Sequence, residues 1–184
     1  TQTMRWYEWS LKVLGVKLAI RQGKFDEALA MADDLARTPG VPPGEAIQAD
    51  LAACEALVAS NRIADAEPRI ESCEARLDPR TAPADWGEFQ RIRGAVHERS
   101  GQSSDAYHDF AQSVNVFELL GDRYQAALSQ LALGRLSAAT RAVGAERHLE
   151  QAEATFRVLR AERDLEEVAR ARAHLDTDAV AQPA

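Results

Sequence analysis

Four alanines recur along the chain at nearly equal intervals. Ala28, Ala66, Ala106 and Ala145 are separated by 38, 40 and 39 residues, and each opens a ladder of small or apolar residues such as Ala106 followed by Phe110. A fixed period of this length indicates an array of similar units that bury their apolar faces against their neighbours. Such an array usually offers a surface for binding, so the period predicts binding rather than chemistry.

The composition favours helices over strands. Apolar residues make up 46% of the 184 residues, which is enough for a substantial core. Most of them are Ala and Leu, which favour the α-helix together with the many Glu and Arg residues. No stretch alternates apolar and polar residues over the length of a strand. We therefore expect an all-α protein.

The charge and the cysteine content exclude several functional classes. The net charge of −7 argues against a nucleic-acid-binding surface, which requires clustered Lys and Arg. No apolar run is long enough for a transmembrane helix, and no signal peptide is recognisable. Two cysteines without metal-ligand spacing suit a reducing compartment. We expect a cytoplasmic protein that binds neither nucleic acid nor a membrane.

Loops rich in Pro and Gly divide the chain into helical hairpins. The expected repeats cover residues 5–40, 44–79, 84–121 and 122–160, followed by a ninth, capping helix at 162–175 and a disordered tail at 176–184. Residues 1–175 would thus form a single solenoid domain. We expect Ser103 or Ser104 to be the N-cap of the second helix of the third repeat. Gly121 should end the same helix in the left-handed conformation. Pro68 should lie in a first helical turn.

Small residues recur in the middle of the first helix of each hairpin. Gly15, Gly94 and Gly134 occupy this position, and Cys54 takes it in the second hairpin. Glycine inside a helix costs about 1 kcal/mol relative to alanine. Its repeated use indicates that the two helices of a hairpin approach closely there, against the ladder alanine of the second helix.

These residues resemble a known repeat family. Leu133-Gly134, Gly94 and the pair formed by Ala106 and Phe110 are similar to the tetratricopeptide repeat (TPR) signature over about residues 10–175. The period is near 39 rather than about 34 residues, and the usual aromatic residue after the glycine is replaced by Ala19, His97 and Ser137. The resemblance implies a right-handed α-α superhelix of about four hairpins, similar to the arrays of bacterial transcription and signalling regulators.

In a superhelix of this kind the first helices line a concave groove. Positions three before and one after the small residue, and one turn further on, should face it; in the first hairpin the corresponding positions are two before and two after Gly15. The groove residues predicted in this way are Val13, Lys17, Leu51, Glu55, Val58, Arg91, Glu98, Leu131 and Arg135. Such a mixed groove suits an amphipathic helix or an extended apolar peptide. The alternative is that the apolar members belong to the core and the register is shifted by one.

The first helix carries two apolar stripes. One consists of Trp6, Trp9, Val13, Val16 and Ile20, and the other of Tyr7, Leu11, Leu14 and Leu18. A terminal helix of a solenoid should be polar on its outer side, so this helix is expected to be buried on two sides, by an upstream repeat or by a second chain. Trp6, Tyr7 and Trp9 are the predicted self-association residues. The alternative is that the tryptophans fold back over the next helix.

The sequence shows no catalytic pattern. The histidines His97, His108, His148 and His174 lie apart without a partner four residues away, and neither a P-loop nor a nucleophile elbow is present. We expect no enzyme, no cofactor and no metal. Cys54 and Cys73 fall on facing positions of one hairpin, where free buried thiols are favoured and a disulfide switch is the alternative.

The function expected from these observations is that of a non-enzymatic protein-interaction module. It would be the TPR segment of a larger bacterial transcriptional or signalling regulator, binding a peptide, a helix or another domain of the same protein. One alternative is a homo-oligomerisation scaffold, for example a homodimer, that uses the aromatic first helix. A weaker alternative is a sensor of a small ligand.

Overall fold

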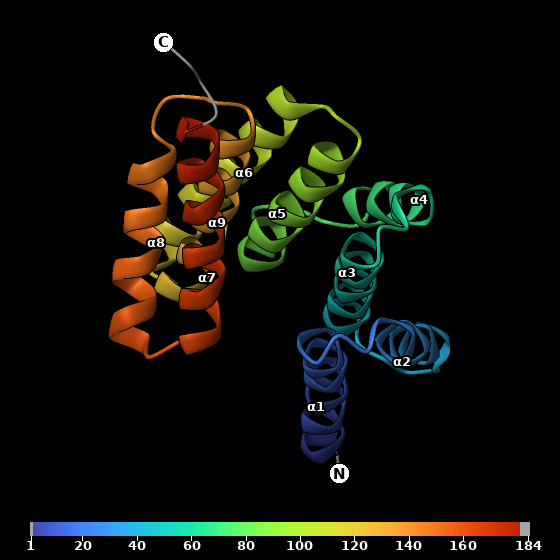
Figure 1. The fold of residues 1–184 in the computed structure, drawn as a ribbon. Helices are drawn as coiled ribbons and strands as arrows, with labels where there is room; N and C mark the ends of the chain where they lie inside the picture. The colour runs from blue at the N-terminus through green and yellow to red at the C-terminus, as the bar shows by residue number, and fades with distance from the viewer. Residues whose placement is uncertain (1, 181–184) are drawn as a thin grey trace. The chain divides into compact units, whose positions relative to one another are not determined.

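The protein is entirely helical over the part that its structure describes. The computed structural model describes the backbone of residues 2–180 and the side chains of residues 7–173. Residues 2–180 form nine α-helices and no strand (Figure 1), which confirms the all-α prediction. The helices are α1 (Gln2–Arg21), α2 (Phe25–Arg37), α3 (Pro43–Ala59), α4 (Ile63–Glu74), α5 (Pro83–Arg99), α6 (Ser103–Leu120), α7 (Arg123–Ala139), α8 (Ala145–Leu159) and α9 (Glu162–Val180).

The helices form two compact units, Thr1–Asp85 and Trp86–Ala184, which are described separately. In the first unit, α1 packs against α2 and α3, and α3 also packs against α2 and α4. In the second unit, α6 packs against α7, α7 against α8, and α9 against both α7 and α8. Most of these pairs are consecutive along the chain, as expected for helices joined by short loops.

The junction between α6 and α7 follows the sequence prediction. Gly121 ends α6 with a φ angle of 72°, and its N–H donates to the carbonyl of Glu118. A left-handed residue at this position favours glycine. Asp122 then caps α7, because its Oδ1 accepts a hydrogen bond of 3.1 Å from the backbone N–H of Gln125.

Two other predicted helix ends are wrong. Ser103 is already the first residue of α6, and the residue before it, Gln102, makes no side-chain cap, so neither serine has the predicted capping position. The fourth helix begins at Ile63, which places Pro68 in the second turn rather than the first. Proline has no N–H to donate to the carbonyl of Ala64 there, so tertiary packing has to hold α4 in place.

The last helix is longer than the sequence predicts. Because α9 continues to Val180, residues 176–180 are helical rather than part of a disordered tail, and residues 181–184 lie outside the described part of the chain. Val168 and Ala171 of α9 pack with Phe156 of α8 in one apolar cluster. The helix therefore covers α8, as the prediction of a capping helix requires.

The alanine ladders form the core of the second unit. Ala106, Phe110 and Val114 of α6 pack against Leu133 and Leu136 of α7. The next ladder, on α8, packs against α7 and α9; its members in that cluster are Leu149, Ala152 and Phe156. Each ladder therefore lies at the contact between its own helix and a neighbouring first helix, so the sequence period corresponds to a period of packing.

The mid-helix glycines lie where two helices approach most closely. A Cβ at Gly134 would lie 2.5 Å from Leu149 Cδ2 and 2.8 Å from its Cγ, and one at Gly94 would lie 2.7 Å from the Phe110 ring. Carbon atoms do not approach so closely without displacing one another. The large residue after the ladder alanine thus fills the space that the missing Cβ leaves, which confirms the predicted close approach.

We expect Gly134→Ala to destabilise the protein although alanine is the better helix former. Overpacking a filled core costs about 1–3 kcal/mol, which exceeds the gain of about 1 kcal/mol in helix propensity. Leu149 is fully buried and has no free space into which to move. Urea unfolding followed by far-UV circular dichroism measures the difference.

Gly44→Ala is the matched control, because Gly44 lies in the first turn of α3 and a Cβ added there would have no atom within 4 Å. It should leave stability unchanged or slightly higher. A Gly134→Ala variant as stable as the wild type would contradict the close-approach argument.

Candidate protein-binding surfaces

The four apolar members of the predicted groove are buried inside the protein. None is more than 8% exposed; they are Val13, Leu51, Val58 and Leu131. Leu131, for example, packs with Leu149 and Phe156 in the core of the second unit. A first helix has neighbours on both flanks, so its apolar positions face those neighbours. Assigning these four residues to a partner-binding surface is therefore corrected: they belong to the core.

The five polar members of the predicted groove lie nearer the surface. Arg135 Nη2 lies 3.4 Å from Glu98 Oε2, and Arg91 Nη1 donates to Gln125 Oε1 at 2.7 Å. The other two members are half-buried and also interact with other residues; they are Lys17 and Glu55. These side chains make contacts within the protein, and their role in binding a partner stays a prediction.

The residues predicted for self-association divide into two groups. Trp9 is only 7% exposed, and its ring carries Lys12 Nζ at 4.7 Å from the centroid. It therefore belongs to the inner stripe of α1 and cannot form an outer interface. Tyr7 is 58% exposed and points to the surface. The side chain of Trp6 lies outside the described residues.

The second stripe of α1 forms an exposed apolar face. We call this the α1 outer face; its residues are Tyr7, Leu11, Leu14 and Leu18, each 58–67% exposed. The described chain alone leaves this stripe exposed, so its burial by an upstream repeat or by a second chain stays a prediction. Large apolar side chains are exposed singly on most surfaces, but a contiguous stripe of them marks an interaction site.

The positions equivalent to Leu14 and Leu18 are buried on α7. Leu14 precedes Gly15 as Leu133 precedes Gly134, yet Leu133 is only 2% exposed. Four residues further along each helix, Leu18 corresponds to Ser137, which is fully buried. The difference has an identifiable cause on α7, since Leu133 packs against Ala106, Phe110 and Val114 of α6.

Helix α3 has the same arrangement in the first unit. The positions equivalent to Leu14 and Leu18 are Ala53 and Leu57, and both are buried. Leu57 lies beside Leu29 and Ala30 of α2, which packs on α3. On both inner helices, the second helix of the preceding hairpin covers the face that α1 exposes.

One position of this face is polar on the inner helices and apolar on α1. Asp50 of α3 lies 3.6 Å from the Arg69 guanidinium on α4, and Gln130 of α7 accepts a hydrogen bond of 2.7 Å from His148 Nδ1 on α8. Both partners follow the ladder alanine by three residues. On α1 the equivalent residue is Leu11, which therefore lacks a polar group to pair with the next helix.

The α5–α6 hairpin has a charged version of the same contact. Asp109 of α6 is almost fully buried, and Arg93 donates to both of its carboxylate oxygens at 2.7 and 3.0 Å. His97 Nδ1 lies 2.9 Å from the same carboxylate. The sequence placed His97 alone, but the structure shows it in this cluster. Because both oxygens already bind Arg93, the cluster holds two helices together and is not arranged for acid–base chemistry.

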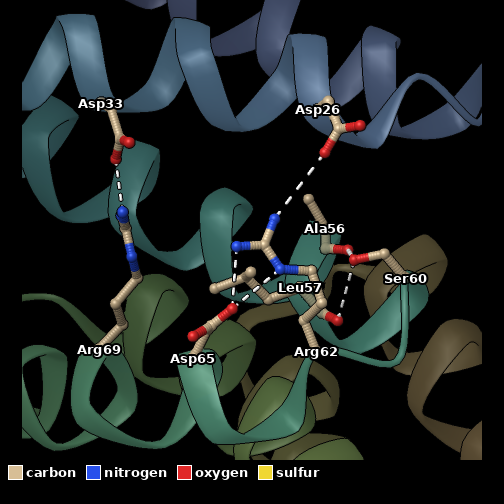
Figure 2. Close-up of polar contacts among 8 residues, drawn as sticks. All are labelled: Asp26, Asp33, Ala56, Leu57, Ser60, Arg62, Asp65 and Arg69. Carbon is tan, nitrogen blue, oxygen red and sulfur yellow. Dashed lines mark hydrogen bonds and ion pairs between the residues drawn. The ribbon is translucent and has the colours of Figure 1, made fainter.

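A groove of about 560 Å³ runs between α2 and α4 on the first unit. Figure 2 shows Asp33 and Asp26 of α2 directed toward Arg69 of α4 and Arg62, the residue before α4, respectively. Arg69 Nη2 lies 2.5 Å from Asp33, and Arg62 Nη1 lies 3.8 Å from Asp26. Asp65 also pairs with Arg62, at 2.8 Å. The groove is thus lined by arginines that carboxylates already neutralise.

The sequence contains a signal for this groove in the equal spacing of two acidic and two basic residues. Asp26 and Asp33 are seven residues apart on α2, and Arg62 and Arg69 are seven apart at α4. Residues seven apart lie on one face of a helix. Two faces of opposite charge with equal spacing predict a pair of ion pairs between the helices.

A second groove, of about 410 Å³, lies on the second unit between α6, α7 and α8. Phe117 and Glu118 form one wall, Gln151 and Thr155 the other, and Gln130 lies at its base. The hydrogen bond from His148 holds the Gln130 side chain in place. The lining of this groove mixes polar and apolar residues, whereas the α1 outer face consists of large apolar side chains.

Metal and membrane sites do not appear in the described part of the chain. Among the described side chains, no three His, Cys, Asp or Glu residues are grouped so that they could hold a metal ion. None of the described helices has both the length and the apolar character needed to cross a bilayer.

The sequence matches no protein-family model, and no curated protein is detectably similar to it.

We expect His148→Gln to reduce the loss of stability in acid. Burial, and then the positive charge of Arg147, lower the pKa of His148 below its ordinary value of 6.5. As the pH falls below 6.5, His148 binds a proton in the unfolded chain but not in the folded protein. The free energy of unfolding therefore decreases. Between about pH 8 and about pH 5 the variant should lose less stability than the wild type.

Urea unfolding at the two pH values measures this difference. The exposed His108 provides the control, because His108→Gln should keep the pH dependence of the wild type. Equal pH dependence in the wild type and in His148→Gln would show that His148 does not contribute.

Proposed function

We propose that this protein is a non-enzymatic helical-repeat module that binds an amphipathic helix on the α1 outer face. The observation that carries the proposal is the exposure of four large apolar side chains in one stripe, two of which, Leu14 and Leu18, occupy positions that are buried on α3 and α7. Burying a leucine side chain contributes about 1.5–3 kcal/mol. A stripe of this size therefore supplies enough energy for specific docking.

The spacing of the stripe supports a helical partner. Tyr7, Leu11, Leu14 and Leu18 follow one another at intervals of four, three and four residues, which is the spacing of a helix–helix seam. An extended peptide would instead require pockets at every second residue.

The protein itself provides a template for the partner. Helix α6 covers the equivalent face of α7 with Ala106, Phe110 and Val114, a small residue followed by two larger apolar ones at intervals of four. We infer that the helix bound by α1 has the same pattern. It could belong to a further hairpin of the same polypeptide or to another protein, since the packing chemistry is the same.

We also propose a TPR-like fold and a regulatory role for the protein. A TPR-like, right-handed α-α superhelix would place a helix of this pattern before α1, in continuation of the repeat. The resemblance to arrays of bacterial transcription and signalling regulators supports a role as the interaction segment of such a regulator, acting in the cytoplasm.

Self-association is the second candidate, because the same stripe is self-complementary. In an antiparallel pair of α1 helices, Tyr7 would lie opposite Leu18 of the second copy, and Leu11 opposite Leu14. The pair would bury about 1,000 Å² in total, near the lower limit for a specific interface. In this dimer Leu14, rather than Trp9, lies at the centre of the interface.

We expect Leu14→Asp to abolish docking without affecting the fold, since Leu14 is exposed. A labelled peptide with the sequence of α6, Ser103–Leu120, serves as the probe, and fluorescence anisotropy measures its affinity for the full chain. The substitution should weaken binding by about tenfold or more, because it places a charge at the centre of an apolar contact.

Leu119→Asp is the matched control, because Leu119 is 89% exposed on α6 and lies outside the α1 outer face. It should bind the peptide as the wild type does. Light scattering over a range of concentrations distinguishes the second candidate: a mass that rises in the wild type and not in Leu14→Asp identifies a second copy as the partner. A protein that neither binds the peptide nor self-associates would contradict the proposal.

A further inference from the structure

The two cysteines of the chain meet inside the α3–α4 hairpin. Cys54 and Cys73 are both fully buried and both free, and their thiols form a hydrogen bond with each other. Cys54 occupies the small position that glycine has in the other hairpins, where the two helices approach most closely. Cys73 follows the ladder alanine Ala66 by seven residues on α4, which packs on α3, and its sulfur accepts the hydrogen bond from Cys54.

The surroundings make the two sulfurs unequal. The Cys54 thiol, which donates to Cys73, lowers the pKa of Cys73, and Arg76, whose Nη2 lies 3.7 Å from Cys73 Sγ, also lowers it. The hydrogen bond to Cys73 and burial raise the pKa of Cys54. Asp50, which pairs with Arg76 at 2.6 Å, opposes ionisation of both thiols. The thiolate is the nucleophilic form of cysteine, so Cys73 is the reactive sulfur and Cys54 keeps its proton.

We propose that Cys54 and Cys73 form a dithiol that hydrogen peroxide oxidises to a disulfide, which links α3 to α4. The small size of this oxidant matters, because a bulky disulfide reagent cannot reach two buried sulfurs in the folded protein.

The reaction is balanced in two steps. The Cys73 thiolate attacks one oxygen of the peroxide, the O–O bond breaks, and Cys73 becomes a sulfenic acid while hydroxide leaves and takes up a proton as water. The Cys54 sulfur then attacks the sulfenic sulfur, the S–O bond breaks, and the Cys54 proton leaves with the second water. Two thiols and one peroxide thus give one disulfide and two waters.

The bond would fix a weak element of the first unit. Helix α4 is short and has Pro68 in its interior, and it also carries Arg69 at one wall of the α2–α4 groove (Figure 2). A covalent link to α3 would prevent α4 from separating and so preserve the groove. Oxidation of the two cysteines by peroxide would therefore stabilise the first unit.

The test is performed on the wild-type full chain, folded and at low concentration. After treatment with hydrogen peroxide, the thiol count should fall from two to zero, and the intact mass should decrease by about 2 Da because two hydrogens are lost. The thermal midpoint should rise by several degrees, as for a cross-link that restricts the unfolded chain. A reducing agent should reverse all three changes.

Single variants test the unequal roles. With Cys54→Ser, Cys73 should form a sulfenic acid, which dimedone traps when it is added together with a denaturant after the peroxide has been removed; with Cys73→Ser, the remaining Cys54 should not react at the same peroxide dose. The proposal is overturned if folded wild-type protein keeps two titratable thiols, or if a non-reducing gel shows disulfides only between chains. Equal trapping in both single variants would overturn the assignment of Cys73 as the reactive sulfur.

Discussion

The structure depends on how closely the two helices of a hairpin approach each other. At Gly94 and Gly134 the absence of a Cβ lets a Phe or Leu from the next helix fill the contact. Because the helices touch there, the rotation of each first helix is determined, and with it the set of side chains that face inward. The burial of Leu133 under α6 and the exposure of Leu14 on α1 are both consequences of this one constraint.

Polar contacts between the two helices of a hairpin determine how these helices are aligned along their axes. Asp50 with Arg69, Asp109 with Arg93 and Gln130 with His148 all join a first helix to the second helix of its hairpin. Buried polar pairs contribute little net stability because desolvation offsets their attraction, but each pair is satisfied in one alignment only. Leu11 of α1 has no polar group with which to form such a pair, and the outer face of α1 is left exposed and apolar.

The second hairpin shows that the small position can carry chemistry as well as packing. Cysteine is small enough to stand where glycine stands elsewhere, and a ladder residue on α4 is also cysteine. Cys54 at the small position and Cys73, which lies three residues beyond Ile70 on α4, form a hydrogen-bonded thiol pair beside Arg76. The α1 outer face and the thiol pair thus arise from the same repeat geometry, through different residues at corresponding positions.

The sequence by itself determined the all-α class, the hairpin period, the close approach at Gly134 and the left-handed end of α6 at Gly121. These properties depend on local preferences and on spacing along one helix. Only the tertiary structure decided which apolar stripe faces outward, that Leu51 is core, and that His97 meets Asp109. A stripe on a helix is apolar whether or not a neighbour covers it, so its exposure depends on which helices surround it, and the stripe alone does not contain that information.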